Sequence, residues 1–562
     1  MYSEDRPRAG RRVPRTLLVI LAVQAGLSLL LAMSNTAFGD EALYMWAGHV
    51  ELTHWFSHVA VPGMTYDAYF SGAPQLYPPL AAMADSAGGL LGARMLSLLF
   101  MLGTTFLLYS TANRLSGRKA ALFSCALWLA CEPNLRMGGY ATYDPMAIFF
   151  ICLALWAAVK AAGSKNHAEL VGLSALAAAI GCVTAYSYAI YLPAVVIISH
   201  FAWARARGPK RSLISVAGMI ILMGGLLALI PTLLHLWHGI SFTTIHRDIS
   251  RDHETRASIL QTAWEYAGLV TVISAAAAVL AIAAAKGRSD RLLRCALLGA
   301  AFVVPVYQIL IVKTGWALDK HLAVGMWCVV LVAGLGLASI SWPRIKGPAL
   351  VAAASVALAV PVFDGWFSAY GIQRSWPDMS HLVAAVRPLA ASEHGTLYVG
   401  ATPSYLDYYT WPATLKRVIW KSSISLDPST QPGSPVSYYR NEIRQQAPGL
   451  VVLLFPGYLR SQSLPADVFR VLRGGKDARS QLAQVGAINS QEPGAYEFAL
   501  ALQQDPHYRL VSSGPVNSGY GSFGSEPSTF FIWQRIKAPA APSLAHRPAA
   551  SARPSARSHQ GH

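Results

Sequence analysis

The chain has 562 residues, of which 54% are hydrophobic and only 13% are charged. This composition is too apolar for a soluble protein of that length, so a membrane is the expected solvent. The formal net charge of +17 could suggest a nucleic-acid partner, but the basic residues lie mainly in short loops between apolar runs and in the last 25 residues. Membrane topology accounts for them better, and no nucleic acid is expected.

Apolar runs that are long enough to cross a bilayer recur from residue 16 to about residue 367 and then stop. A spanning helix needs about 20 apolar residues. The first run lacks a convincing small-residue cleavage site, so it is predicted to be an uncleaved span rather than a signal peptide. The predicted spans, about eleven in number, are residues 16–36, 88–110, 119–132, 144–161, 168–183, 185–203, 213–237, 259–285, 294–312, 321–341 and 347–367.

The basic residues predict the orientation of these spans, because Lys and Arg accumulate on the cytoplasmic side of a membrane. The basic segment 1–15 is therefore predicted to be cytoplasmic, and the odd number of spans places the C-terminal region outside. The loop 37–87 contains five acids and no Lys or Arg, which predicts that it is exported. Within it, residues 44–61 mix aromatic, histidine and aliphatic side chains without the length to span, which predicts a helix in the membrane interface.

The region after the last span has the composition of a soluble domain. Strand-like apolar runs at 395–401, 449–455 and 528–534 are separated by helical and Pro/Gly-rich segments, which is typical of one α/β domain over 372–537. All six cysteines lie in or beside membrane segments, so this domain has none for a disulfide. The tail 538–562 has almost no bulky apolar residues and is predicted to be disordered. Together with a transmembrane domain over 16–371, this describes a multi-pass protein of the inner (cytoplasmic) membrane with an extracytoplasmic α/β domain.

Acidic residues stand at the outer ends of two predicted spans. Asp40 and Glu41 follow the first span directly, and Asp144 opens the span at 144–161. A carboxylate near the hydrocarbon edge is costly unless it faces protein or water, so each is a candidate functional residue. The alternatives are that Asp40 and Glu41 mark the start of a solvated loop and that Asp144 caps a helix. Two acids at one depth could instead share a site in which one takes a proton from an acceptor hydroxyl.

Four short motifs in this order resemble the GT-C glycosyltransferases. They are DEALY at 40–44, QLYPPL at 75–80, ARMLSLLF at 93–100 and TYDPMAIFF at 142–150. The closest branch is the protein mannosyltransferase and lipid A aminoarabinose transferase type. The resemblance implies a GT-C-like fold and an enzyme that moves a sugar, with inversion, from a polyprenyl-phosphate donor to an envelope lipid, a glycan or an exported protein outside the membrane. It implies that Asp40 is the catalytic base or the acid that orients the acceptor, that Glu41 assists, and that Asp144 is the second acid.

A lipid-phosphate leaving group needs cations near the outer interface. Basic residues predicted to lie outside depart from the usual charge distribution and are therefore the candidates for phosphate binding, with interfacial snorkelling as the alternative. Lys320 and His321 also resemble a late-loop basic element of the family. The candidates are Arg94, Arg136, Lys313, Lys320 and His321.

Tyrosines in the same segments are predicted to contact substrate, although an aromatic belt at the interface accounts for them as well. They are Tyr44, Tyr77, Tyr143 and Tyr186. His54 and His58 are four residues apart and could share a divalent metal ion on one helix face, but a third ligand is not apparent. No cofactor is otherwise predicted.

The competing function is a transporter or flippase of envelope precursors. The sequence has no clear internal repeat, which argues against a transporter.

Overall fold

The computed structural model describes residues 14–59, 70–246, 254–315, 317–340, 348–393, 397–399, 404–411, 420–422, 440–441, 443–445, 447–456, 495–516 and 528–536. They form two compact units. The first comprises Met1–Arg387, Thr402–Lys416 and Pro515–Ser528, and the second comprises the rest of the C-terminal region. Most of the basic segment 1–15 and the whole of the tail 538–562 lie outside the described residues.

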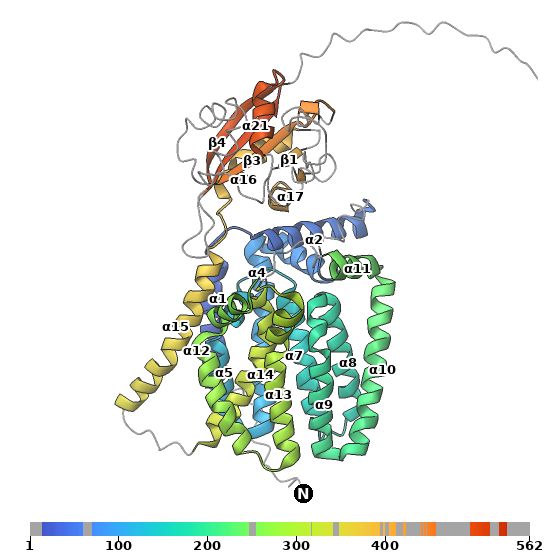
Figure 1. Cartoon of the computed structure of the whole chain (residues 1–562), viewed down its shortest axis with the longest axis vertical. Coiled ribbons are helices and arrows are strands. Elements are labelled where there is room, and N and C mark those ends of the chain that lie inside the picture. Colours follow the sequence, from blue (N-terminus) through green and yellow to red (C-terminus); the bar gives the residue numbers. More distant parts are fainter. Residues whose placement is uncertain are drawn as a thin grey trace, which may run out of the picture. The chain divides into compact units, whose positions relative to one another are not determined.

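The first unit is a bundle of long helices (Figure 1). They are α1 (Arg15–Ala32), α4 (Tyr77–Ser116), α5 (Arg118–Leu129), α7 (Asp144–Ala161), α8 (His167–Thr184), α9 (Leu192–Arg207), α10 (Pro209–Leu233), α12 (Arg256–Ala283), α13 (Arg288–Tyr307), α14 (Leu318–Ser339) and α15 (Pro348–Gln373). The shorter elements are α2 (Gly39–Ser57), α6 (Glu132–Gly138), η1 (Tyr186–Tyr191), α11 (Trp237–His246), η2 (Gln308–Val312), α16 (Ser380–Ser392), which continues into the second unit, and α17 (Ser404–Tyr409).

Within the described residues, nine helical segments are long and apolar enough to cross a membrane, which confirms the predicted multi-pass helical architecture. The predicted number of about eleven needs a correction at 119–132. There, α5 has 12 residues, and at about 1.5 Å per residue it rises about 18 Å, well short of a hydrocarbon core of about 30 Å. The helix α15 occupies the position of the last predicted span but is not among the nine.

The helix α14 lies inside the bundle. In the most apolar 18-residue stretch of each helix, 83% of the residues are buried within the protein for α14 and 17% for α10. It packs against α12, α5 and α13. Because other helices rather than lipid surround it, α14 holds its first residues in a defined place among its neighbours.

The helix α4 folds back on itself at two glycines. Gly88 and Gly89 are non-helical, and Gly89 has a φ of 61°, which glycine adopts at little cost. The Tyr77 hydroxyl lies 2.9 Å from the Ser97 hydroxyl, whereas 20 residues of straight helix would separate them by about 30 Å. Pro78 and Pro79 occupy the first turn of α4, where the backbone N–H that proline lacks would have no partner within the helix.

The helix α2 lies across one end of the bundle (Figure 1). It begins at Gly39, five residues before the predicted interfacial helix, so Asp40 and Glu41 lie in its first turn rather than in a loop. It packs closely on the start of α4, because a Cβ on Gly48 would lie 2.0 Å from the Pro78 carbonyl oxygen. Its placement at the membrane interface remains a prediction.

The second unit is built on a five-stranded sheet in the order β2-β1-β3-β5-β4. The pairs β1–β2 and β1–β3 are parallel, and Leu450 to Leu453 of β3 are completely buried. The predicted strands are confirmed as β1 (Leu397–Val399), β3 (Leu450–Pro456) and β5 (Ser528–Arg535). The strands β2 (Trp420–Ser422) and β4 (Tyr508–Val516) were not predicted, and α21 (Ala495–Gln504) completes the described elements.

Candidate active site

Lys320 lies between two carboxylates from distant parts of the chain. Its Nζ is 3.4 Å from Asp40 Oδ2 and 3.4 Å from Asp144 Oδ2. The Asp144 side chain is completely buried and that of Lys320 is 14% exposed, whereas the Asp40 side chain is 41% exposed. The structure thus brings together both predicted outer acids and one predicted phosphate ligand, and of the three only Asp40 is widely open to solvent.

Three helices begin at this polar centre. Asp40 lies in the first turn of α2, Asp144 is the first residue of α7, and Lys320 lies in the first turn of α14. The first N–H groups of a helix have no partner within it, and the helix dipole places partial positive charge there. Convergence of three such ends stabilises the two aspartates and favours an anionic ligand beside Lys320.

Two tyrosines of η1 fasten α7 to α14 at this centre. The Tyr188 hydroxyl donates to the Lys320 carbonyl at 3.2 Å and lies 3.5 Å from Asp144 Oδ1. The Tyr191 hydroxyl donates to the His321 carbonyl at 2.8 Å. A 3₁₀ helix has three residues per turn, so side chains three apart share a face. The three-residue spacing of Tyr188 and Tyr191 in the sequence matches this shared face.

Two of the four predicted substrate-contacting tyrosines adjoin the centre. The Tyr143 ring lies 5.9 Å from Lys320 Nζ and 4.6 Å from the Tyr44 ring. Burial, with Tyr143 and the nearby Asp40 and Asp144, raises the pKa of Tyr44 well above its usual value, so this tyrosine stays neutral. The other two make different contacts: Tyr77 bonds Ser97, as described above, and the backbone N–H of Tyr186 donates to the Ser71 carbonyl.

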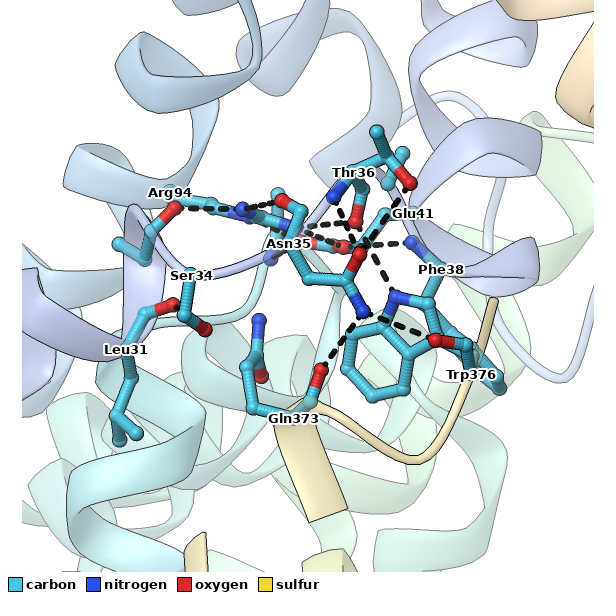
Figure 2. Close-up of polar contacts among 12 residues, drawn as sticks. Leu31, Ser34, Asn35, Thr36, Phe38, Glu41, Arg94, Gln373 and Trp376 are labelled. Carbon is cyan, nitrogen blue, oxygen red and sulfur yellow. Dashed lines mark hydrogen bonds and ion pairs between the residues drawn. The ribbon is translucent and has the colours of Figure 1, made fainter. Parts of the chain in front are cut away.

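Glu41 forms a buried ion pair with Arg94 (Figure 2). Arg94 Nε and Nη2 donate to its two oxygens at 2.8 and 2.7 Å. Glu41 also accepts from the backbone N–H groups of Phe38 at 2.9 Å and Ala141 at 2.7 Å. Both side chains are almost fully buried. The carboxylate therefore ties α2 to α4 and to the segment before α7.

Arg94 has no donor left for a phosphate. Besides Glu41, its remaining N–H groups donate to the carbonyls of Ala32, Asn35 and Thr36, at 2.6, 2.9 and 3.0 Å. All five guanidinium donors are thus used. The structure corrects the phosphate-ligand prediction for Arg94 because this arginine is an internal brace of the turn after α1.

The same turn is also bonded to the end of α15 and to the residues that follow it (Figure 2). Asn35 Nδ2 donates to the carbonyls of Gln373 and Trp376 at 3.1 and 3.0 Å. The Trp376 indole in turn donates to the Thr36 carbonyl at 3.2 Å. The backbone that leads into α2 is therefore fixed from several sides before it reaches Asp40.

Arg136 lies in a second buried ion cluster instead of at an open surface. Its Nε donates to Glu132 at 2.8 Å, its Nη2 pairs with Asp319, and the Tyr140 ring centroid lies 5.5 Å from the guanidinium carbon. Asp319 directly precedes Lys320. Arg136 thus holds the start of α14 and, in this arrangement, is engaged by acids rather than available as the predicted phosphate ligand.

The loop before α14 has its own anchor in Glu254. This carboxylate accepts from Thr314 Oγ1, the Gly315 N–H and Ser258 Oγ at 2.8, 2.9 and 3.0 Å. Burial opposes its ionisation, but these hydrogen bonds outweigh it and lower the pKa of Glu254. Lys313, a predicted phosphate ligand in this loop, is exposed, and none of the described polar contacts joins its side chain to the Lys320 centre.

His54 and His58 lie at the exposed end of α2. His54 Nδ1 donates to the Val59 carbonyl at 2.8 Å, and His58 ends the helix with a left-handed φ of 53°. Among the described residues, no group of three or more His, Cys, Asp or Glu side chains could hold a metal ion. A divalent metal ion at these histidines therefore stays a prediction.

Glu132 is expected to make the stability depend on pH. Burial outweighs the nearby Arg136 and raises the pKa of Glu132 to about 7, and its Oε2 has no hydrogen-bond partner among the described residues. The pKa of Glu132 is higher in the folded than in the unfolded protein. Its protonated form therefore contributes to the free energy of unfolding below about pH 4.5, and this stabilisation is lost as the pH rises through about 7. We expect Glu132→Gln to flatten this slope in thermal unfolding between pH 5 and pH 8, a range chosen to straddle that pKa. An unchanged slope would contradict the assignment.

Comparison with known proteins places this geometry in context. The sequence profile described as dolichyl-phosphate-mannose-protein mannosyltransferase matches residues 85–238. No relative among curated proteins matches the chain. Solved structures are similar in fold at low identity. One is ArnT from Cupriavidus metallidurans bound to undecaprenyl phosphate, with a TM-score of 0.56 and 14% identity, covering 95% of this chain and 99% of that one.

Two further structures share the fold. The archaeal oligosaccharyltransferase AglB from Archaeoglobus fulgidus, in complex with an inhibitory peptide and a dolichol-phosphate, has a TM-score of 0.53 and 11% identity, covering 88% of this chain and 79% of that one. The arabinofuranosyltransferase AftD from Mycobacteria has a TM-score of 0.52 and 16% identity, covering 93% of this chain and 42% of that one.

Proposed function

The chain has the GT-C glycosyltransferase fold in a multi-pass membrane protein, and we propose that it transfers a sugar from a polyprenyl-phosphate donor to an acceptor on the extracytoplasmic side of the inner membrane. Two structures of this fold contain a polyprenyl phosphate, undecaprenyl phosphate in ArnT and dolichol-phosphate in AglB. The acceptor is an envelope lipid, a glycan or an exported protein.

One observation carries this proposal: Lys320 is shared by a half-exposed and a buried aspartate where three helices begin. An ammonium group has three N–H donors. Two of them face carboxylates at 3.4 Å, which is longer than the usual charge-assisted hydrogen bond. A phosphate oxygen can therefore be bound by the third donor, or can displace Asp40, without the loss of a strong bond.

The two aspartates differ in what they can reach. Asp144 is completely buried and close to Lys320 and Tyr188, so its role is to hold the lysine in place. Asp40 is 41% exposed and makes one long contact with Lys320. Asp40 can approach an acceptor hydroxyl from solvent, and it is the base in this proposal.

The proposed reaction is a single displacement with inversion. The acceptor oxygen attacks the anomeric carbon on the face opposite the phosphate, and its proton moves to Asp40. The bond between the anomeric carbon and the phosphate oxygen breaks, and its electron pair stays on the polyprenyl phosphate. Lys320 and the helix N-termini stabilise the negative charge that develops there. No redox partner is needed.

Replacing Lys320 by methionine is expected to lower kcat/KM for the lipid donor about 10²- to 10³-fold, since a charge stabiliser of the leaving group is lost. Lys320→Arg should retain part of the activity because it keeps the positive charge. The rest should be lost because a planar guanidinium replaces the compact ammonium group. Steady-state kinetics of sugar transfer measure both variants. Lys119→Met, at an exposed position in the first turn of α5, is the matched control. Equal loss in Lys119→Met and Lys320→Met would count against a specific role for Lys320.

The proposed activity as a whole is tested by mass spectrometry of envelope lipids, glycans and exported proteins from cells with and without the chain. We expect one class of molecule to lose a single sugar mass when the chain is absent and to regain it with the wild-type chain. If all three classes are unchanged, sugar transfer is not the activity.

A further inference from the structure

The short helix α17 belongs to the membrane-embedded unit although it comes from the C-terminal region of the sequence. Residues Thr402–Lys416 form part of the first compact unit, separated in sequence from its other parts. Within that unit α17 packs against α2, the helix that begins at Asp40 and Glu41. A segment that returns from the soluble region to this helix calls for an explanation.

Two tyrosines of α17 contact the backbone at the start of α2. The Tyr409 hydroxyl accepts a hydrogen bond of 2.7 Å from the N–H of Ala37, a residue that is completely buried. The Tyr405 hydroxyl lies against Gly39, where a Cβ would be 3.6 Å from it. Ala37 lies two residues before α2, and Gly39 is its first residue. The backbone N–H groups of the first turn of a helix have no partner within the helix. The tyrosines therefore brace the backbone directly before Asp40.

The third tyrosine fastens α17 further along α2. The Tyr408 hydroxyl donates to Asp85 at 2.7 Å, and the other oxygen of Asp85 bonds His49 of α2 at 2.7 Å. The Trp411 ring, just after α17, stacks on the His49 ring at 5.5 Å. Arg387 also donates twice to the Tyr409 carbonyl. The position of α17 is thus determined by several contacts, so it can serve as a fixed support.

We propose that Tyr405 and Tyr409 are positioning residues for Asp40, and that α17 is a strut that fixes the first turn of α2 during sugar transfer. This inference rests on the proposed function for its effect on rate, but not for the contacts themselves. Asp40 touches Lys320 only at 3.4 Å, so the direction of its carboxylate depends on the backbone that carries it. A shift of about 1 Å in a catalytic group can cost about 10²-fold in rate.

The test removes single hydroxyl groups from the full-length chain. For Tyr409→Phe we expect a fall in kcat of about 10- to 10²-fold, with KM for the polyprenyl-phosphate donor unchanged, because the base is misplaced while Lys320 is not. Tyr405→Phe should have the same effect and provides a second variant if the first does not fold. Tyr307→Phe, which changes an exposed tyrosine on α13, should behave as wild type. An unchanged kcat in folded Tyr409→Phe and Tyr405→Phe would overturn the proposal.

Hydrogen exchange at the amides of residues 37–42 gives a readout that does not depend on activity. In Tyr409→Phe these amides should exchange faster than in wild type, whereas those of α14 should not change. Unchanged exchange at residues 37–42 would refute the strut even if activity fell. If the wild-type chain transferred no sugar, the proposed function would fail, and this exchange measurement would still decide whether α17 braces α2.

Discussion

Replacing Arg94 by methionine is expected to destabilise the protein by about 3–5 kcal/mol, the usual cost of leaving one partner of a buried ion pair uncompensated. Glu41 would then remain in the interior with two of its four hydrogen bonds. The carbonyls of Ala32, Asn35 and Thr36 would each lose a donor as well. The thermal unfolding midpoint of the purified chain in detergent measures this effect.

Two further variants separate the ion pair from the loss of a large side chain. The double variant Arg94→Met with Glu41→Met should recover part of the lost stability, since no buried charge remains unpaired. Arg118→Met, at the exposed first residue of α5, should leave the midpoint unchanged. If Arg94→Met unfolds at the wild-type temperature and mainly weakens donor binding, the phosphate-ligand prediction for Arg94 would be right and the brace wrong.

The replacement Asp40→Asn is expected to lower kcat about 10²- to 10⁴-fold while the unfolding midpoint stays close to wild type. Asparagine has nearly the same shape and can still accept a hydrogen bond from Lys320, but it cannot take the acceptor proton. The side chain is 41% exposed and has one long polar contact, so little stability depends on it. Transfer kinetics and thermal unfolding on the same preparation measure both quantities.

Glu41→Gln is expected to have the opposite pattern to Asp40→Asn. It should lower the unfolding midpoint, and activity should fall as a consequence of the lost stability. Glu169→Gln, at an exposed acid of the first turn of α8, is the neutral control. Full activity of Asp40→Asn would remove Asp40 as the base and would leave Asp144 as the next candidate.

The sequence predicted the membrane bundle well because hydropathy reports directly on burial in lipid. It predicted the three central strands of the second unit for a similar reason, since short apolar runs bounded by Pro and Gly are typical of buried strands. It failed at α5, where the chain is apolar because it packs inside protein. Hydropathy does not distinguish a short buried helix from a span.

The roles of Asp40 and Glu41 could not be separated from the sequence. They were predicted to lie in a loop, where adjacent residues have no fixed relation. In the first turn of α2, neighbouring side chains point about 100° apart. One therefore meets Lys320 and the other meets Arg94. Only the register of the helix assigns one acid to the open centre and the other to the interior.

Contacts between residues far apart in the sequence could not be predicted either. Arg94 was conspicuous as a cation predicted to lie outside, but its five acceptors are carbonyls and a carboxylate on other segments. Tyr405 and Tyr409 lie more than 360 positions from the start of α2 in the sequence, and no local pattern relates them to it. Such contacts depend on tertiary structure, which a single sequence does not reveal.

The most direct test of the central claim is the release of polyprenyl phosphate by the purified full-length chain in lipid nanodiscs. The chain would be supplied with polyprenyl-phosphate sugars and an extract of envelope acceptors, and the lipid products would be followed by mass spectrometry. We predict that the wild-type chain converts one donor to free polyprenyl phosphate with the sugar on an acceptor, and that Asp40→Asn does not. Equal conversion by Asp40→Asn, or binding of every donor without conversion by the wild-type chain, would contradict a sugar-transfer centre at Asp40, Lys320 and Asp144.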